Sequence, residues 1–264
     1  MTYLKTLFYN HVMKLLLLGD IVGRKTVEYL SKNLWSLRKE KGIDMVIANG
    51  ENATDIMGLS PEDAQALLDG GVDVITGGNH IFHNKALYTM LDDSKYILRP
   101  LNAPYAAPGC GETIFDCNGY NVLVLNLLGM MSMDHAQNPF EAVDRALKRN
   151  EGRYDFAVLD FHAEATAEKQ AMGYYLCGRA AIVFGTHTHV QTADECILDG
   201  GTAYITDLGM CGPTGGILGT DKSVILKKFT TGLPQKFIVA TGDIKLSGAI
   251  VTIENNKATS ICRI

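Results

Sequence analysis

Side chains that can bind metal ions or transfer protons recur at five places in this 264-residue chain. Each place directly follows a short apolar run of strand length. Because functional loops gather at the carboxyl ends of the strands in an open α/β sheet, we expect these five loops to meet on one rim. The residues concerned are Asp20, Asn49, Glu51, Asn52, Asn79, His80, His162, His187 and His189.

Taken alone, each of these groups also has an ordinary structural explanation. Asp20 could cap a helix, and Asn49-Gly50 is a common turn. Glu51 is harder to explain in that way, because an unpaired carboxylate directly after a buried strand is costly. His187 and His189 are two residues apart, so in an extended segment both rings would project to the same side. Both observations favour a metal site.

The donor atoms of this set indicate which metals suit it. Imidazole, carboxylate and amide groups without thiolates favour manganese, iron or zinc over copper(I) or an iron–sulfur cluster. One catalytic metal does not normally take seven protein ligands and keep an open position. Two ions that share a carboxylate account for the full set. The predicted ligands are Asp20, Glu51, Asn52, Asn79, His162, His187 and His189.

The elements that must position these groups alternate between strands and helices. Buried strands are expected at 14–18, 44–48, 72–76, 121–128, 155–161 and 181–184, and helices at 25–41, 61–69, 139–149 and 166–176. Ser60-Pro61 is typical of a helix start. Two hairpins are expected later, around Asp199-Gly200-Gly201 and Asn255-Asn256. This order predicts an α/β fold in one domain, with a mixed sheet or two stacked sheets and helices outside.

Composition limits the classes of function. A formal charge of −5 argues against a general nucleic-acid coat, although metal ions could still attract a small phosphorylated substrate. No apolar run approaches the roughly 20 residues that cross a membrane. The six cysteines form no C-x-x-C pair, which indicates free thiols in a reducing compartment. We therefore expect a cytoplasmic protein, with a poorly ordered extension at 1–12 and one domain at 13–264.

Six sequence blocks, in order, resemble the calcineurin-like metallophosphoesterase superfamily, and within it the bacterial YmdB-like branch. The similarity extends over nearly everything from Met13 onward. The superfamily pattern Asp-x-His has Val22 at its third position here, and Glu51 and Asn52 are adjacent, as is the rule in the branch. The blocks are Gly19-Asp20-Ile21-Val22-Gly23, Asn49-Gly50-Glu51-Asn52-Ala53-Thr54, Gly78-Asn79-His80, the segment 160–169, the segment 185–194 and the segment 206–213.

The resemblance implies a four-layer α/β/β/α sandwich and a division of the ligands between two metals. Asp20, Asn52 and His189 would hold one ion, and Asn79, His162 and His187 the other. Glu51 would bridge the two. His80 matches the family's catalytic histidine, which does not ligate metal. The resemblance also implies iron or manganese, phosphodiester substrates such as 2′,3′-cyclic nucleotides, and a homo-oligomer.

The expected activity is therefore hydrolysis of phosphodiesters by two metal ions. A water bridging them would be deprotonated and would attack phosphorus, while His80 would protonate or stabilise the departing alkoxide. Two alternatives are a phosphomonoesterase such as a nucleotidase, with the same metal centre, and a metal-bound regulatory scaffold. His83 is near the site in sequence and could line it, but we expect it to be a solvent-facing residue at a helix start. Cys211 is expected to be a packed thiol that is not a nucleophile.

Overall fold

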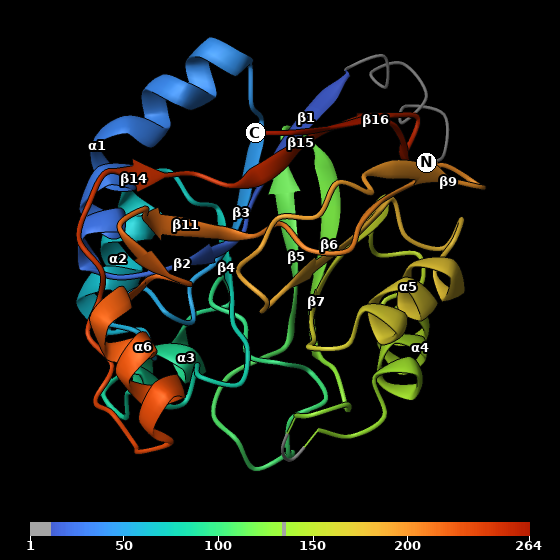
Figure 1. Ribbon diagram of the computed structural model, residues 1–264. Coiled ribbons are helices and arrows are strands. Elements are labelled where there is room, and N and C mark those ends of the chain that lie inside the picture. Colours follow the sequence, from blue (N-terminus) through green and yellow to red (C-terminus); the bar gives the residue numbers. More distant parts are fainter. Residues whose placement is uncertain (1–11, 134–135) are drawn as a thin grey trace.

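The computed structural model describes residues 12–133 and 136–264, and its first large sheet has five strands (Figure 1). β1 pairs in parallel with β3, and β3 with β4, while β15 runs antiparallel to β1. The strand order is β16 (Lys257–Arg263), β15 (Gly248–Glu254), β1 (Met13–Leu18), β3 (Met45–Asn49) and β4 (Val74–Thr76).

The second large sheet has six strands. Its four central strands are parallel, and an antiparallel strand closes each edge. The order is β5 (Glu112–Cys117), β6 (Tyr120–Leu128), β7 (Phe156–His162), β8 (Ile182–Thr186), β10 (Thr202–Ile205) and β9 (Cys196–Leu198).

Two small sheets complete the strand list. β2 (Asp20–Ile21), β11 (Met210–Pro213) and β14 (Ile244–Lys245) form one, and β12 (Gly216–Ile217) and β13 (Thr220–Asp221) form the other. β2 runs parallel to β11, and this pairing sets Asp20 beside Met210. Asp20, the first predicted ligand in the sequence, is thereby held against a segment nearly two hundred residues later in the chain.

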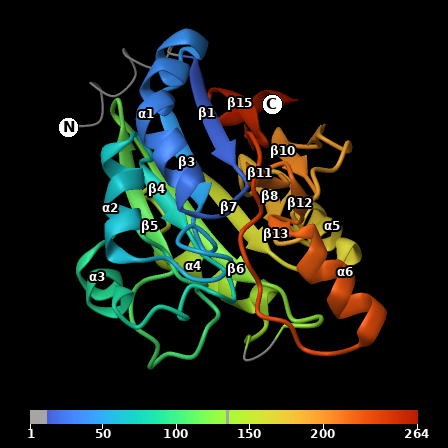
Figure 2. The same cartoon turned by 60° about the vertical axis from the view of Figure 1, so that its left-hand side comes forward.

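Helices cover the outer faces of both large sheets, as Figures 1 and 2 show. α1 (Arg24–Lys41), α2 (Pro61–Asp69) and α3 (Leu87–Asp93) share an apolar core with the five-stranded sheet. α4 (Pro139–Arg149) and α5 (Thr166–Tyr175) do the same on the six-stranded sheet. A third core lies between the two sheets. The predicted α/β/β/α sandwich is confirmed, and α6 (Lys222–Thr231) lies beside these layers.

Local chemistry explains where several elements begin and end. The hydroxyl of Ser60 accepts a hydrogen bond from the backbone N–H of Asp63, and Pro61 occupies the first helical turn, so α2 starts where its sequence predicts. Gly42 adopts a left-handed conformation with φ +65°, and its N–H bonds the carbonyl of Arg38 to end α1. Both signals are local, which is why they can be recognised in the sequence.

The predicted strands, helices and hairpins are all present, and several further elements were not predicted. The two hairpins form as β9–β10 and β15–β16. β5 was missed because it is an edge strand with a polar sequence, and α3 because it has only seven residues. α6 buries only Ile225, so its sequence carries little amphipathic pattern.

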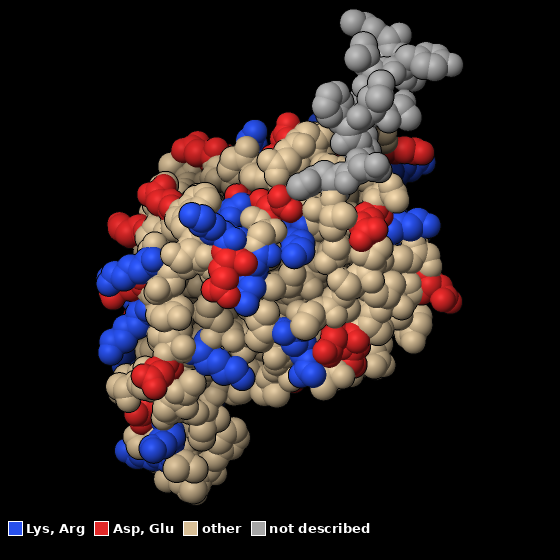
Figure 3. Space-filling view, turned by 90° about the horizontal axis from the view of Figure 1, so that it is seen from above, with Lys and Arg blue, Asp and Glu red and all other residues tan. Residues whose placement is uncertain are grey.

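The charged side chains on one face of the molecule are of both signs. On the face seen in Figure 3, lysine and arginine are interspersed with aspartate and glutamate. Within residues 12–133 and 136–264, no helix is both long and apolar enough to span a bilayer. β1 begins at Met13, and the predicted extension at 1–12 falls outside the described residues except for Val12.

Candidate metal centre

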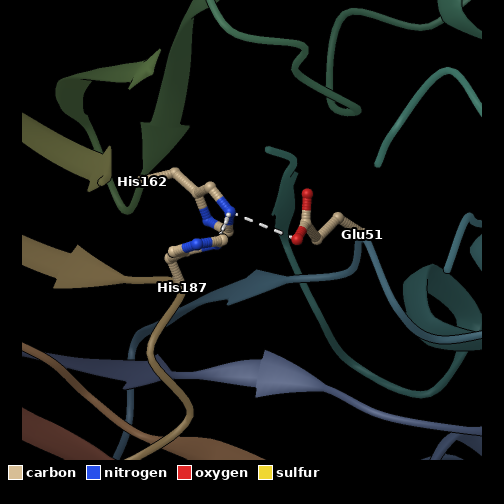
Figure 4. A group of neighbouring side chains, drawn as sticks. All are labelled: Glu51, His162 and His187. Atoms are coloured by element: carbon tan, nitrogen blue, oxygen red, sulfur yellow. Dashed lines mark hydrogen bonds and ion pairs between the residues drawn. The ribbon is translucent and has the colours of Figure 1, made fainter. Parts of the chain in front are cut away.

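Three potential ligand atoms from three different loops converge on Nε2 of His162, at the end of β7. Oδ1 of Asn79 lies 3.1 Å from this nitrogen, Nδ1 of His187 3.0 Å and Oε1 of Glu51 3.2 Å. Figure 4 shows Glu51, His162 and His187 pointing toward one another from separate elements. One potential ligand atom from each of the three lies within 4.8 Å of the other two. Such a concentration of nitrogen and oxygen donors is the arrangement that a divalent cation requires.

A second group of donors adjoins the first. Nε2 of His189 lies 3.8 Å from Oδ1 of Asp20 and 3.3 Å from the amide nitrogen of Asn52. Glu51 contacts both groups, because its Oε1 also accepts a hydrogen bond from Asn52. All seven predicted ligands are therefore neighbours, although they come from five loops spread over 170 residues of sequence.

The carboxylate of Asp20 shows that this second group fits a cation. The residue is fully buried, and its Oδ2 accepts a hydrogen bond from the backbone N–H of His187 at 3.0 Å. Oδ1 is buried with no hydrogen-bond partner among the described residues. A buried, unpartnered carboxylate oxygen is costly, and a positive ion beside it would remove that cost.

The three histidines are oriented by oxygen acceptors on their outer sides. The contacts are His162 Nδ1 to Thr186 Oγ1 at 2.9 Å, His187 Nε2 to Glu164 Oε2 at 3.1 Å, and His189 Nδ1 to the Leu218 carbonyl at 3.2 Å. A ring nitrogen that donates to such an acceptor carries the proton, so the other nitrogen presents its lone pair. In all three rings the nitrogen on the opposite side is the one that faces the cluster.

Asp160 accepts hydrogen bonds from residues that contact His162, and it was not among the predicted site residues. It is fully buried, and its carboxylate accepts hydrogen bonds from Thr186 at 2.7 Å and from the amide of Asn49 at 3.1 Å. Burial raises the pKa of Asp160 to about 6, against the opposing effects of His162 and these donors. An acidic residue inside the apolar strand run 155–161 was the sequence signal for it.

The backbone at His187 and His189 differs from the extended segment that the sequence analysis assumed. Both residues are left-handed, with φ +104° and +63°. Between them, Thr188 donates hydrogen bonds from its N–H and its hydroxyl to Oδ2 of Asp207, at 3.1 and 2.8 Å. The extended geometry was therefore wrong. Both rings reach the site because the buried Asp207 holds a strained turn.

His80 lies next to the cluster without contributing to the group around His162. Its backbone N–H donates to Oε2 of Glu51 at 2.9 Å, and its Nδ1 lies 2.9 Å from Oδ1 of Asn52. In this orientation the amide nitrogen of Asn52, not its oxygen, faces His189. A rotation of 180° about χ2 would exchange the two atoms and present the oxygen to the cluster.

The ionisable groups of the site perturb one another strongly. Burial raises the pKa of Asp20, with partial compensation from His189 and His162. Burial opposes ionisation of Glu51 as well, but the charge and hydrogen bond of His162 lower its pKa well below the usual value. Burial and the charge of His162 lower the pKa of His187 to about 3, and burial also lowers that of His80. Such clustering of shifted groups is typical of functional sites.

The fold and this cluster at the strand ends define the metallophosphoesterase class, whose fold implies divalent metal ions. The YmdB-like protein family matches residues 16–264, so the chain belongs to that family and is a hydrolytic phosphoesterase. It is 42% identical over 254 residues to a 2′,3′-cyclic-nucleotide 2′-phosphodiesterase of Bacillus subtilis, with 96% of both chains covered.

Two solved structures are similar over almost the whole chain. A hypothetical protein from Thermus thermophilus superposes with a TM-score of 0.90 at 37% identity, covering 96% of this chain and 98% of that one. A novel phosphatase from Mycoplasma pneumoniae superposes with the same TM-score at 32% identity, covering 96% and 93%. At these levels of identity and coverage, the overall fold is shared with both.

Proposed function

We propose that this chain hydrolyses phosphodiesters, with 2′,3′-cyclic nucleotides as its substrates, at a centre of two metal ions. The observation that carries the proposal is the pair of adjoining donor groups joined by Glu51, one of which contains the unpartnered buried oxygen of Asp20. The name of the Bacillus subtilis relative supports the choice of substrate.

Each donor group would hold one ion. Asn79, His162 and His187 would bind the first, Asp20, Asn52 and His189 the second, and Glu51 both. Nitrogen and oxygen donors without thiolates suit iron or manganese, with zinc as a further candidate. When bound, the ions supply the positive charge that activates water and neutralises the oxygens of the phosphate.

His80 would act on the leaving oxygen. Its side chain is one-quarter exposed, whereas Glu51 and His162 beside it are closed to solvent. The hydrogen bond between its Nδ1 and Asn52 fixes the ring at the edge of the metal cluster. From there, His80 would donate a proton to the departing alkoxide or stabilise its charge, which contributes roughly 10²–10⁴-fold to the rate.

Metal analysis with a matched substrate pair tests the centre. The purified protein is analysed by mass spectrometry for metals and assayed with bis(p-nitrophenyl) phosphate, p-nitrophenyl phosphate and 2′,3′-cyclic AMP. About two ions per chain and preferential diester hydrolysis are expected. Preferential monoester hydrolysis would indicate the nucleotidase alternative. One ion or none, with no activity after iron or manganese is restored, would favour the regulatory scaffold.

Replacement of His80 separates catalysis from metal binding. His80→Ala should lower kcat by roughly 10²–10⁴-fold while two metal ions remain bound. Loss of metal together with activity would make His80 a ligand and contradict the assigned role. If the variant keeps its effect in cells without turnover, the scaffold role is favoured. Homo-oligomer formation, cytoplasmic location and any binding of nucleic acid remain predictions, the first of them measurable by light scattering.

A further inference from the structure

A cavity of about 490 Å³ opens directly beside the two groups of predicted metal ligands. It shares the segment Gly78–His80 with the site, so a ligand bound at the site can extend into the cavity. Volumes of 300–1,000 Å³ are typical of small-molecule sites. Most of the remaining wall is apolar and includes Phe82, Pro100, Pro104, Ala107, Leu128 and Met133.

The lining of this cavity is unsuited to a charged group. It contains no lysine, arginine, aspartate or glutamate among the described residues, and His80 and His83 are its only ionisable side chains. Two other cavities of the molecule differ in this respect: one is lined by Arg99, Arg145 and Arg149, and another by Lys228 and Lys236. The charge of a phosphate would be better compensated in a cationic cavity, whereas a flat aromatic group suits the apolar cavity.

Phe82 gives this cavity a firm aromatic wall. Its ring packs edge-to-face on Tyr88, with 6.4 Å between ring centroids, and the hydroxyl of Tyr88 donates to the Phe82 carbonyl at 2.9 Å. The side chain is half-buried against the core under α1–α3, so part of it remains available to the cavity. His83 is exposed, as expected, and it also lines the cavity, with its ring edge-on to that of His80.

The identity of the leaving group places the nucleoside on the same side of the site as His80. In a 2′,3′-cyclic nucleotide the leaving oxygen belongs to the ribose, so the group that protonates it must adjoin the sugar. With the phosphate at the metal cluster and His80 at the leaving oxygen, sugar and base extend past His80. The apolar cavity is the space that they meet there.

From these observations we infer that the cavity is the nucleobase subsite, with Phe82 as its main stacking surface. The inference rests on the proposed hydrolysis of cyclic nucleotides and goes beyond it by assigning residues that select a nucleoside over a bare cyclic phosphate. Met133 on the same wall supplies an adaptable apolar contact for the base. Base stacking on an aromatic side chain tolerates any base, so we expect weak discrimination among the four nucleotides.

A comparison of substrates with and without a base tests the inference. We would measure kcat/KM for 2′,3′-cyclic AMP and for base-free ribose 2′,3′-cyclic phosphate with the wild type, Phe82→Ala, Phe82→Trp and Phe229→Ala. Phe229 is 79% exposed on α6 and lies outside the cavity, so it is the matched control. Phe82→Ala should lose roughly 5- to 150-fold with cyclic AMP, mainly through KM, and almost nothing with the base-free substrate. Phe82→Trp should retain the activity.

Two other outcomes would overturn the inference. An equal loss on both substrates would show that Phe82 acts only through the fold of the loop, and no loss on either would place the base elsewhere. If the wild type hydrolyses p-nitrophenyl phosphate but neither cyclic substrate, the proposed function itself has failed.

Binding of adenosine gives a readout that needs neither metal nor turnover. Adenosine carries no phosphate, so only the cavity can bind it under the inference. Wild-type protein freed of metal should give a saturable calorimetric signal, and Met133→Ala and Phe82→Ala should weaken it. Phe229→Ala should bind adenosine as the wild type does. Equal binding by all four proteins would contradict the assignment of the cavity.

Discussion

The hydroxyl of Thr186 lies 2.9 Å from Nδ1 of His162 and donates its own proton to Asp160 at 2.7 Å. Because the hydroxyl has one proton to donate, it must accept the proton of His162. This series of hydrogen bonds orients the ring of His162 so that Nε2 faces the other predicted ligands. The three residues lie on β7 and β8, so the tautomer of His162 is set by two adjacent buried strands.

Thr186→Val should therefore weaken metal binding without large loss of fold. The two side chains have nearly the same shape, but valine cannot accept a hydrogen bond from His162 or donate one to Asp160. Loss of such an outer partner typically lowers metal affinity 10- to 100-fold. Competition with a chelator measures the affinity, and Thr186→Ser, which keeps the hydroxyl, should bind metal as the wild type does. Unchanged affinity in the valine variant would refute the role of the hydroxyl.

Gly78 should be intolerant of even one extra carbon. A Cβ at this position would collide with Oε2 of Glu51 and Nε2 of His162. Gly78→Ala should lose bound metal and activity together, because both of those residues are predicted ligands. Gly119→Ala is the control: there φ is +90° but a Cβ meets nothing within 4 Å, so only backbone strain is added. Retention of two metals in Gly78→Ala would contradict the assignment of Glu51 and His162 as ligands.

The ion pair between Lys169 and Asp207 should be essential for stability. Its atoms are 2.6 Å apart and both side chains are 1% exposed. Lys169→Met would leave the carboxylate of Asp207 buried without its cation, at a cost of about 3–5 kcal/mol in the free energy of unfolding. Arg145→Met removes a comparable pair on the surface, where Arg145 and Glu141 are 56% and 68% exposed, and should cost only about 0.3–0.5 kcal/mol. Denaturant titration compares the two variants.

The same ion pair should also influence metal binding, since Asp207 holds the turn that carries His187 and His189. Lys169→Met is expected to bind metal more weakly than Arg145→Met under conditions in which both proteins are folded. Equal metal content in the two variants would show that the turn keeps its shape without Lys169.

Two of the six cysteines should resist alkylation in the folded protein. Burial raises the pKa of both Cys117 and Cys211 to about 12, so at pH 8 about one thiol in 10⁴ is ionised. Iodoacetamide should modify the exposed Cys110, Cys196 and Cys262 first. Peptide mass spectrometry after a timed reaction identifies the sites. Labelling of Cys211 as fast as that of Cys196 would contradict its interpretation as a packed thiol.

Local sequence determined much of the fold. Ser60 and Pro61 start α2 because capping depends on a few consecutive residues, and Asp199-Gly200-Gly201 turns the chain between β9 and β10 for the same reason. The apolar runs became the buried strands because they are continuous. The candidate ligands could be listed because each follows such a run. α6 and β5 carry no equally strong local signal, since one buries a single residue and the other lies at an edge.

The orientation of the site was decided only by tertiary structure. Asp160 and Thr186 become partners of His162 because β7 and β8 are adjacent, and Asp207 shapes the turn at His187 and His189 from a different loop. Residue types and spacing therefore determined which groups could bind metal. Which nitrogen each histidine presents, and that an apolar cavity adjoins His80, depend on contacts between segments distant in sequence, because only packing brings those segments together.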